Sequence, residues 1–130
     1  MKKLLMTLMI AGLMTVGAAT VSAQTAPKSV IHVVTVSWKA GTTPEQIKTA
    51  LDGAQALPAQ YKGITHVWTR SLKVQNVKGT PKDAEKTNAI VMEFVDEAAL
   101  KAYTDSPAQK EWYKVYLPIR GESTTFDITN

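Results

Sequence analysis

Residues 30–46 read VIHVVTVSWKAGTTPEQ, which places a strand, a turn and the start of a helix in direct succession. The first nine of these residues are mostly β-branched and are apolar on both faces, which is typical of a strand that is covered on both sides. Gly41 ends the strand, and Thr43 and Gln46 form a capping box with Pro44 in the first helical turn. This stretch therefore predicts a β-strand that leads through a short turn into an α-helix.

The rest of the chain continues with alternating elements. Apolar residues at three- and four-residue spacing extend the helix to Leu57, where the following proline is expected to end it. Three more strands are predicted, over residues 64–72, 88–95 and 123–129. Asp96 and Ser106 are expected to cap two helical segments before the last strand. The order β-α-β-β-α-β predicts a ferredoxin-like α+β fold, in which two helices cover one face of an antiparallel sheet.

The N-terminal residues have the three parts of a secretory signal peptide. Lys2 and Lys3 are followed by an apolar run from residue 4 to about residue 16 and by the small-x-small motif at residues 21–23, so cleavage is expected before Gln24. A retained membrane anchor is the alternative, but the run is shorter than the roughly 20 apolar residues that span a bilayer. We expect a signal peptide over residues 1–23, a linker over 24–29 and one domain over 30–129. The protein is thus predicted to be periplasmic or secreted, without a stable membrane anchor.

The composition narrows the classes of partner. The chain contains no cysteine, so in an oxidising compartment the fold must be held by packing and not by disulfides. Removal of residues 1–23 leaves 13 basic and 11 acidic residues, a net charge of +2. A charge this small, without a basic stripe, argues against nucleic acid as a partner.

Six short segments follow, in order, the pattern of one family. They are GTTPE at 41–45, ALP at 56–58, KGI at 62–64, NAIVMEF at 88–94, LKAY at 100–103 and SPA at 106–108. In these segments the chain resembles the stress-responsive A/B barrel (Dabb) family over residues 30–129. The resemblance implies a stress-related homodimer in which the helix-free faces of two ferredoxin-like sheets pack together into a dimeric α+β barrel.

The apolar residues themselves also favour a homodimer. Two helices cover only one face of the sheet. We assign to the other face the apolar side chains of Val34, Val36, Trp38, Ile90 and Met92. In the second strand we expect Ile64, His66 and Trp68 on one face. Such an apolar patch is too large for the surface of a soluble monomer, so a partner chain should cover it.

The resemblance also identifies site candidates. His32 matches a histidine that lines the family's cavity, although a neutral core histidine bonded to a carbonyl or to Tyr103 is the alternative. Tyr103 matches the tyrosine before a His-Pro-x-His segment, where a tyrosine and a histidine carry catalysis in the family's plant polyketide cyclase. That segment reads SPAQ here, from Ser106 to Gln109, and Asn88 stands where the family often has a histidine. Because an amide cannot take up a proton near neutral pH, we expect no cyclase activity.

Three functions remain open on the sequence. The leading one is a homodimer that binds a small apolar or aromatic molecule in its barrel. The predicted lining residues are His32, Val34, Val36, Trp38, His66, Trp68, Asn88, Ile90, Met92, Tyr103 and Gln109. The second is a cofactor-independent enzyme, resembling a polyketide cyclase or a monooxygenase, with His32 and Tyr103 as catalytic candidates. The third is a structural or interaction dimer whose cavity is filled by its own side chains, Trp38, His66 and Trp68 included.

Metals and cofactors are not expected. The two histidines have no regular spacing to carboxylates, whereas transition metals require three or four ligands. A haem site is not expected either, because His32 would be its only candidate ligand. The charged segment from Lys73 to Lys86 is interpreted as a solvated connector, and a lid over the barrel mouth is the alternative.

Overall fold

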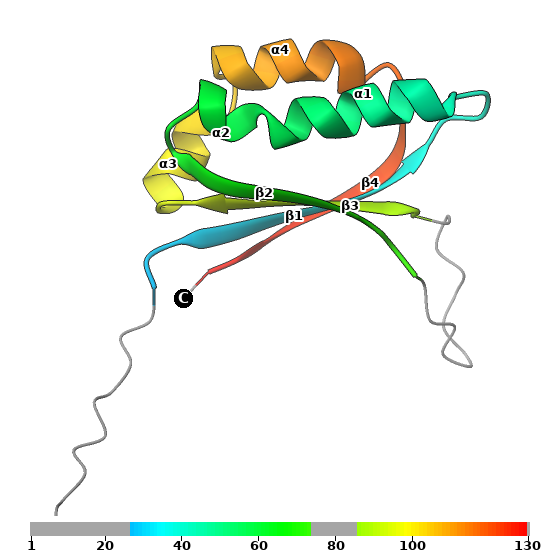
Figure 1. Ribbon diagram of the computed structural model, residues 1–130. Coiled ribbons are helices and arrows are strands. Elements are labelled where there is room, and N and C mark those ends of the chain that lie inside the picture. Colours follow the sequence, from blue (N-terminus) through cyan, green and yellow to red (C-terminus); the bar gives the residue numbers. More distant parts are fainter. Residues whose placement is uncertain (1–26, 74–85, 130) are drawn as a thin grey trace, which may run out of the picture.

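The computed structural model describes residues 27–73 and 86–129, which contain four strands and four helices. In chain order these are β1 (Val30–Trp38), α1 (Pro44–Gln55), α2 (Leu57–Gln60), β2 (Ile64–Ser71), β3 (Asn88–Phe94), α3 (Glu97–Tyr103), α4 (Pro107–Tyr116) and β4 (Arg120–Ile128). The strands form one antiparallel sheet in the order β2-β3-β1-β4. Helices α1, α2 and α4 lie over one face of this sheet, with α3 at one end (Figure 1). The predicted ferredoxin-like α+β fold is confirmed.

The helices begin at the predicted capping residues. The Thr43 side chain accepts a hydrogen bond from the Gln46 amide at 3.2 Å, and the Gln46 side chain accepts one from the Thr43 amide at 2.9 Å. Asp96 and Ser106 each accept a hydrogen bond from the amide three residues later. These bonds satisfy amides that have no partner inside the helix. None of the helices within the described ranges is long and apolar enough to cross a membrane.

Two details of the helices differ from the prediction. Pro58 does not end the helical region, because α2 begins at Leu57 and holds the proline in its first turn, where a missing N–H costs nothing. Val115 on α4, an apolar residue whose spacing from Trp112 predicts burial, is 38% exposed. The stripe follows Ala108, Trp112 and Tyr116 at four-residue spacing, and Val115 lies at its margin.

Two contacts fix α4 above the sheet. The Trp112 indole N–H donates to the backbone carbonyl of Ala50 on α1 at 2.9 Å, and the Trp112 ring stacks on Tyr116 with centroids 4.5 Å apart. Gly53 allows the two helices to approach closely, because a Cβ there would lie 3.1 Å from the Trp112 ring. The position of α4 therefore depends on the packing of Trp112.

The helices cover the face of the sheet that was predicted to be free of helices. Val34, Val36, Ile90 and Met92 are buried with Ala50, Ala54 and Trp112 in the core between the sheet and the helices, and Trp38 packs against this core. Their assignment to the helix-free face was wrong. The reason is that β1 is apolar on both faces, so its alternation alone does not show which face the helices cover.

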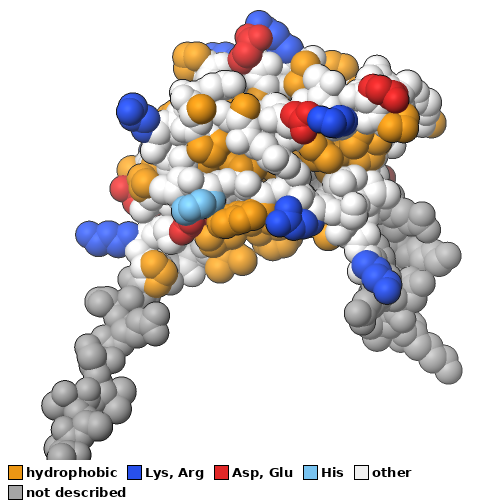
Figure 2. Space-filling view, in the orientation of Figure 1, with side chains coloured by type: hydrophobic (Ala, Val, Ile, Leu, Met, Phe, Trp, Pro, Cys, Tyr) orange, Lys and Arg blue, Asp and Glu red, His pale blue; other side chains and the backbone are white. Residues whose placement is uncertain are grey.

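The helix-free face carries its own apolar side chains. Val33 pairs with Val91 on β3 and with Phe126 on β4, so the three share this face. Phe126 is 47% exposed and Ile128, on the same strand face, is 56% exposed. Figure 2 shows hydrophobic side chains gathered along the lower edge of the molecule, below the sheet. The helix-free face is thus an apolar surface, built from residues other than the predicted ones.

A β-bulge in β2 separates residues that were expected to share a face. Ile64 pairs with Phe94 and is buried, whereas His66 pairs with Glu93 after a register shift between Ile64 and His66. The shift turns His66 and Trp68 to the helix-free face, where their rings stack at 5.3 Å. Simple alternation does not predict this, because a bulge inserts one unpaired residue.

Candidate functional site

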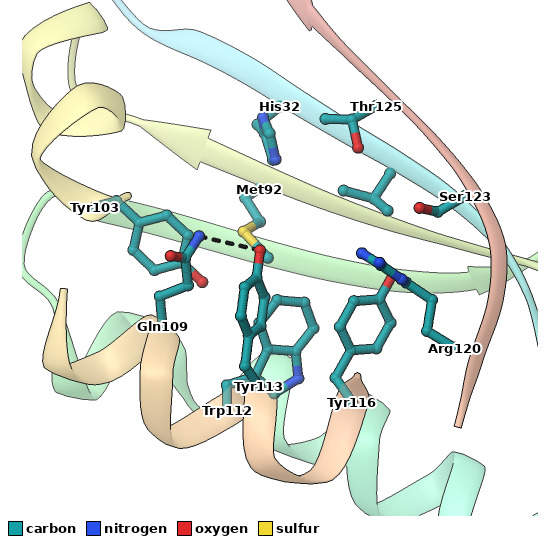
Figure 3. A pocket seen from close by; sticks show the side chains of 11 residues that line it. His32, Met92, Tyr103, Gln109, Trp112, Tyr113, Tyr116, Arg120, Ser123 and Thr125 are labelled. Carbon is teal, nitrogen blue, oxygen red and sulfur yellow. Dashed lines mark hydrogen bonds between the residues drawn. The ribbon is translucent and has the colours of Figure 1, made fainter. Parts of the chain in front are cut away.

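A pocket of about 110 Å³ lies between the helix-covered face of the sheet and α4. It is lined by His32, Val34, Met92, Tyr103, Gln109, Trp112, Tyr113, Tyr116, Arg120, Ser123 and Thr125. The sheet and α4 face each other across it (Figure 3). An apolar cavity of about 150 Å³ can hold benzene, so a pocket of this smaller size limits a bound molecule to a single ring at most.

His32 brings an imidazole that a carboxylate orients. It pairs across the strands with Asp127 on β4, and its Nδ1 lies 2.6 Å from Asp127 Oδ1. The ring also contacts Phe94 edge to face, with centroids 6.0 Å apart. When the neutral ring donates its Nδ1–H to the carboxylate, Nε2 is left as an acceptor. The pair therefore fixes one tautomer of a histidine that lines the pocket.

Two tyrosine hydroxyls in the pocket lack hydrogen-bond partners among the described residues. They belong to Tyr103 and Tyr116, both of which are 2% exposed. Burial raises the pKa of Tyr103 far above its usual value and that of Tyr116 to about 12, although the charge of Arg120 opposes the second shift. Both phenols are therefore protonated at neutral pH. A buried hydroxyl without a partner costs about 1–3 kcal/mol, so a ligand that bonds to it recovers this energy.

Gln109 has a positioning role in this arrangement. Its side-chain carbonyl accepts a hydrogen bond from the Asp105 amide at 2.8 Å, and its Nε2 donates to the Tyr113 hydroxyl at 3.2 Å (Figure 3). Asp105 has a φ of 66°, so this bond also holds a left-handed residue between α3 and α4. Burial raises the pKa of Tyr113, which keeps its hydroxyl protonated as well.

Arg120 brings a positive charge to the wall of the pocket. It begins β4, and its Cζ lies 5.9 Å from the centre of the Tyr116 ring. The ion pairs in the described part of the chain are His32–Asp127, Lys48–Asp52, His66–Glu93 and Lys114–Glu111. Arg120 is in none of them, so within residues 27–73 and 86–129 its charge is not neutralised by a carboxylate.

The structure places the predicted lining residues in three groups. Five of them line the pocket, namely His32, Val34, Met92, Tyr103 and Gln109. Four lie elsewhere on the same side of the sheet: Val36 and Ile90 are buried in the core, and Trp38 donates its indole N–H to Asn88 at 2.9 Å. His66 and Trp68 lie on the helix-free face. The pocket is thus enclosed within one chain, and not between the two sheets where the barrel interior was expected.

Several residues at the site were not found from the sequence. They are Asp127, Trp112, Tyr113, Tyr116, Arg120, Ser123 and Thr125. Only Asp127 had a usable signal, since an acidic residue in the last strand comes opposite His32 once that strand pairs with the first. In residues 27–73 and 86–129, no three His, Cys, Asp or Glu side chains come together as a metal site requires.

Comparison with known proteins gives a consistent picture of the fold. The family model for the Stress Responsive A/B Barrel Domain (Dabb) matches residues 30–130. No curated protein matches the chain. Among solved structures, the Arabidopsis thaliana protein At3g17210 is 21% identical with a TM-score of 0.66, and the match covers 78% of this chain and 94% of that one.

Two further structures are similar. A dimeric ferredoxin-like protein of unknown function from Thermobifida fusca is 16% identical, with a TM-score of 0.62 over 84% of this chain and 97% of that one. A hydroxynitrile lyase from Passiflora edulis is 17% identical, with a TM-score of 0.65 over 81% of this chain and 95% of that one. At these identities the likeness shows the fold alone.

Proposed function

The chain belongs to the stress responsive A/B barrel domain family, and on that basis we propose that it is a homodimer that binds a small, single-ring molecule in the pocket beneath α4. The observation that carries this proposal is the pair of buried hydroxyls of Tyr103 and Tyr116, which line the pocket without partners among the described residues. Val34 and Met92 supply apolar surface for a ring. The rest of the lining is largely polar, and fixed polar groups set the orientation of a bound ligand.

Calorimetry with a panel of single-ring compounds tests this function. We expect the wild-type protein to bind at least one of phenol, benzoate and benzamide, and Tyr103→Phe or Tyr116→Phe to weaken that binding about fivefold or more. Tyr61→Phe is the matched control, because the Tyr61 hydroxyl donates to the backbone carbonyl of Ala99 at 2.7 Å and does not line the pocket. Absence of binding across the panel, or unchanged affinity in both pocket variants, would refute the proposal.

The dimer in this proposal is formed through the helix-free face. Val33, Val91 and Phe126 supply an apolar surface there, and Phe126 is 47% exposed in the single chain. A similar fold from Thermobifida fusca is a dimer, which supports the same state here. The pocket and the dimer contact would then lie on opposite faces of one sheet.

Export is a further part of the proposal. The signal peptide, residues 1–23, and the first half of the linker, residues 24–26, lie outside the described residues. Residues 74–85 of the connector, for which a lid was the alternative, lie outside them as well. The proposal rests on the charged start, apolar run and small-x-small site of the sequence. Mass spectrometry of the exported protein should find Gln24, or its cyclised form, at the N-terminus. An exported chain that retains Met1 would contradict it.

A second function, proton transfer on the bound molecule, is favoured by the His32–Asp127 contact. The carboxylate contact on Nδ1 holds the ring and leaves Nε2 free to accept a proton, so His32 is placed to act as a general base with Asp127 as its positioning residue. The hydroxyl of Tyr103 would stabilise the resulting anion. The sequence had left His32 without a partner for this role.

Deuterium exchange separates this second function from binding alone. Incorporation of deuterium from D2O next to the carbonyl of acetophenone, followed by NMR, should be faster with wild-type protein than in buffer. His32→Gln should abolish this acceleration, and Asp127→Asn should reduce it by at least about tenfold. Exchange no faster than in buffer leaves the protein as a binder without this chemistry.

A further inference from the structure

We propose that the molecule bound in the pocket is an aromatic carboxylate, whose negative charge is held by Arg120. This inference rests on the proposed binding function and adds to it the charge and chemical class of the ligand. Arg120 is a lining residue, and none of the other ten residues that line the pocket is acidic. The charge of the pocket wall is therefore suited to an anion.

The acidic groups near the pocket do not neutralise Arg120. Asp127 is engaged by His32 at 2.6 Å, and Asp105, whose charge acts on Tyr113, forms no ion pair with Arg120. An anion that enters the pocket would meet an arginine that contacts Tyr116 but has no carboxylate partner among the described residues. A charged group in a partly enclosed site is attracted more strongly than on an open surface, because less water screens it.

Two hydroxyl groups line the same pocket as Arg120. Tyr116 presents a protonated hydroxyl beside Arg120, and Ser123 lines the pocket from the same strand as Arg120. A carboxylate offers two oxygens with about four acceptor positions, so it can accept from the guanidinium and from a phenol at once. A neutral alcohol or amide of the same size would leave the guanidinium without a counter-charge.

The orientation of the guanidinium favours a carboxylate over a simple spherical anion. Its Cζ lies 5.9 Å from the Tyr116 ring centre, within the range of a cation–π contact, and Figure 3 shows Arg120 reaching from β4 over Tyr116. An arginine held by a ring keeps its planar fork in one place, and that fork matches the two oxygens of a carboxylate. The ligand ring would then lie against Val34 and Met92.

Calorimetry with benzoate and benzamide tests the inference, because these two ligands have nearly the same shape and differ in charge. The wild-type dimer should bind benzoate about tenfold or more tightly than benzamide at pH 7. Arg120→Gln should weaken the binding of benzoate by at least about tenfold and change the affinity for benzamide by no more than about twofold. Arg120→Lys keeps the charge but not the planar fork. Its affinity for benzoate should lie between those of the wild type and Arg120→Gln. Lys110→Gln, which removes an exposed charge from α4, is the control and should change neither affinity.

The outcomes separate the inference from the function on which it rests. If both ligands bind equally well and Tyr103→Phe weakens both, the pocket is a ligand site but the preference for an anion is wrong. If Arg120→Gln and Lys110→Gln weaken benzoate equally, the effect is one of net charge and the role of Arg120 is refuted. If neither ligand binds, the inference and the binding function both fail. Unchanged benzamide affinity in Arg120→Gln shows that this variant still folds.

Discussion

Two phenol groups in the pocket, those of Tyr103 and Tyr116, are protonated at neutral pH, and burial raises the pKa of both further above 10. Neither hydroxyl has a hydrogen-bond partner among the described residues. Such groups make the empty pocket less stable than a purely apolar one and give a ligand something to bind. At the scale of single residues, binding and stability are therefore opposed at these positions.

Tyr103→Phe tests this opposition. The variant removes a buried hydroxyl that the protein itself does not satisfy, so the free energy of unfolding without ligand should be unchanged or higher by up to about 1 kcal/mol. Urea unfolding at one protein concentration measures it. A loss of more than about 1 kcal/mol would mean that the hydroxyl has a partner in the folded protein.

Glu93 gives a prediction for acid stability. Its pKa is lowered mainly by the hydrogen bond with His66, at 2.8 Å, with a smaller contribution from Thr65. Because the folded pKa lies below the unfolded value of about 4.5, this carboxylate stabilises the fold above that pH, and the stabilisation is lost as the pH falls through the lower folded value.

Glu93→Gln should therefore remove part of the acid sensitivity. Between about pH 5 and pH 3, the free energy of unfolding of the wild type should fall more steeply than that of Glu93→Gln, because only the wild type takes up a proton at this position on unfolding. Glu122→Gln, an exposed change on β4, is the control. Parallel curves for wild type and Glu93→Gln would show that the contact with His66 contributes nothing.

At this scale, some of the sequence candidates lie in the pocket and others do not. His32 and Tyr103 were identified because they match family positions, and both line the pocket. Asp127 and Arg120 were missed, since their roles come from long-range strand pairing and from the fold of the chain after α4. A side chain that acts through a partner about a hundred residues away leaves no local pattern.

At the scale of the elements, α1 and α4 meet through a contact that allows little change. A Cβ at Gly53 would lie 3.1 Å from Trp112 Cδ1, and the Trp112 indole is held by its bond to Ala50. Trp112 also lines the pocket, so the same side chain joins the helices and shapes the site. Trp112 therefore links the packing of these helices to the wall of the pocket.

Gly53→Ala measures how tight that contact is. Alanine favours the helix by about 1 kcal/mol, but overpacking costs about 1–3 kcal/mol, so we expect a net loss of roughly 1 kcal/mol in the free energy of unfolding. Lys48→Ala, on the exposed side of α1, is the control and should change stability by less than about 0.5 kcal/mol. A more stable Gly53→Ala variant would show that the helices can move apart at no cost.

The starts of the helices were the part of the fold best predicted from the sequence, whereas the last strand begins at Arg120, three residues before its predicted start. The caps at Thr43, Asp96 and Ser106 are local signals, and all three form the expected bonds. The face of β1 was wrong because both of its faces are apolar, and the bulge after Ile64 was missed because alternation does not reveal an inserted residue. These features depend on what packs against a strand and not on the strand itself.

At the scale of the whole molecule, the two faces of the sheet have different roles. One packs under the helices and holds the pocket, and the other presents Val33, Val91 and Phe126 to the proposed partner chain. Adjacent residues of β1 therefore belong to different interfaces. This division gives a direct test of the dimer.

Val33→Asp and Val34→Asp form a matched pair for that test. Val33→Asp should give a folded monomer, because an unpaired charge in the dimer contact costs several kcal/mol whereas it is solvated in the single chain. Val34→Asp places the same charge among the side chains that are buried under the helices, so this variant should unfold or aggregate. Sedimentation and circular dichroism distinguish the results. A native-like dimer of Val33→Asp would place the contact elsewhere.

The central claim is that the pocket beneath α4, and not the helix-free face, takes the ligand, and an NMR titration of the tryptophan indole N–H signals with benzoate tests it most directly. Trp112 lines the pocket, whereas Trp68 lies on the helix-free face and is 39% exposed. The predicted result is a saturable shift of the Trp112 signal with little change at Trp68. A shift of the Trp68 signal alone, or no saturable shift at either, would contradict the claim.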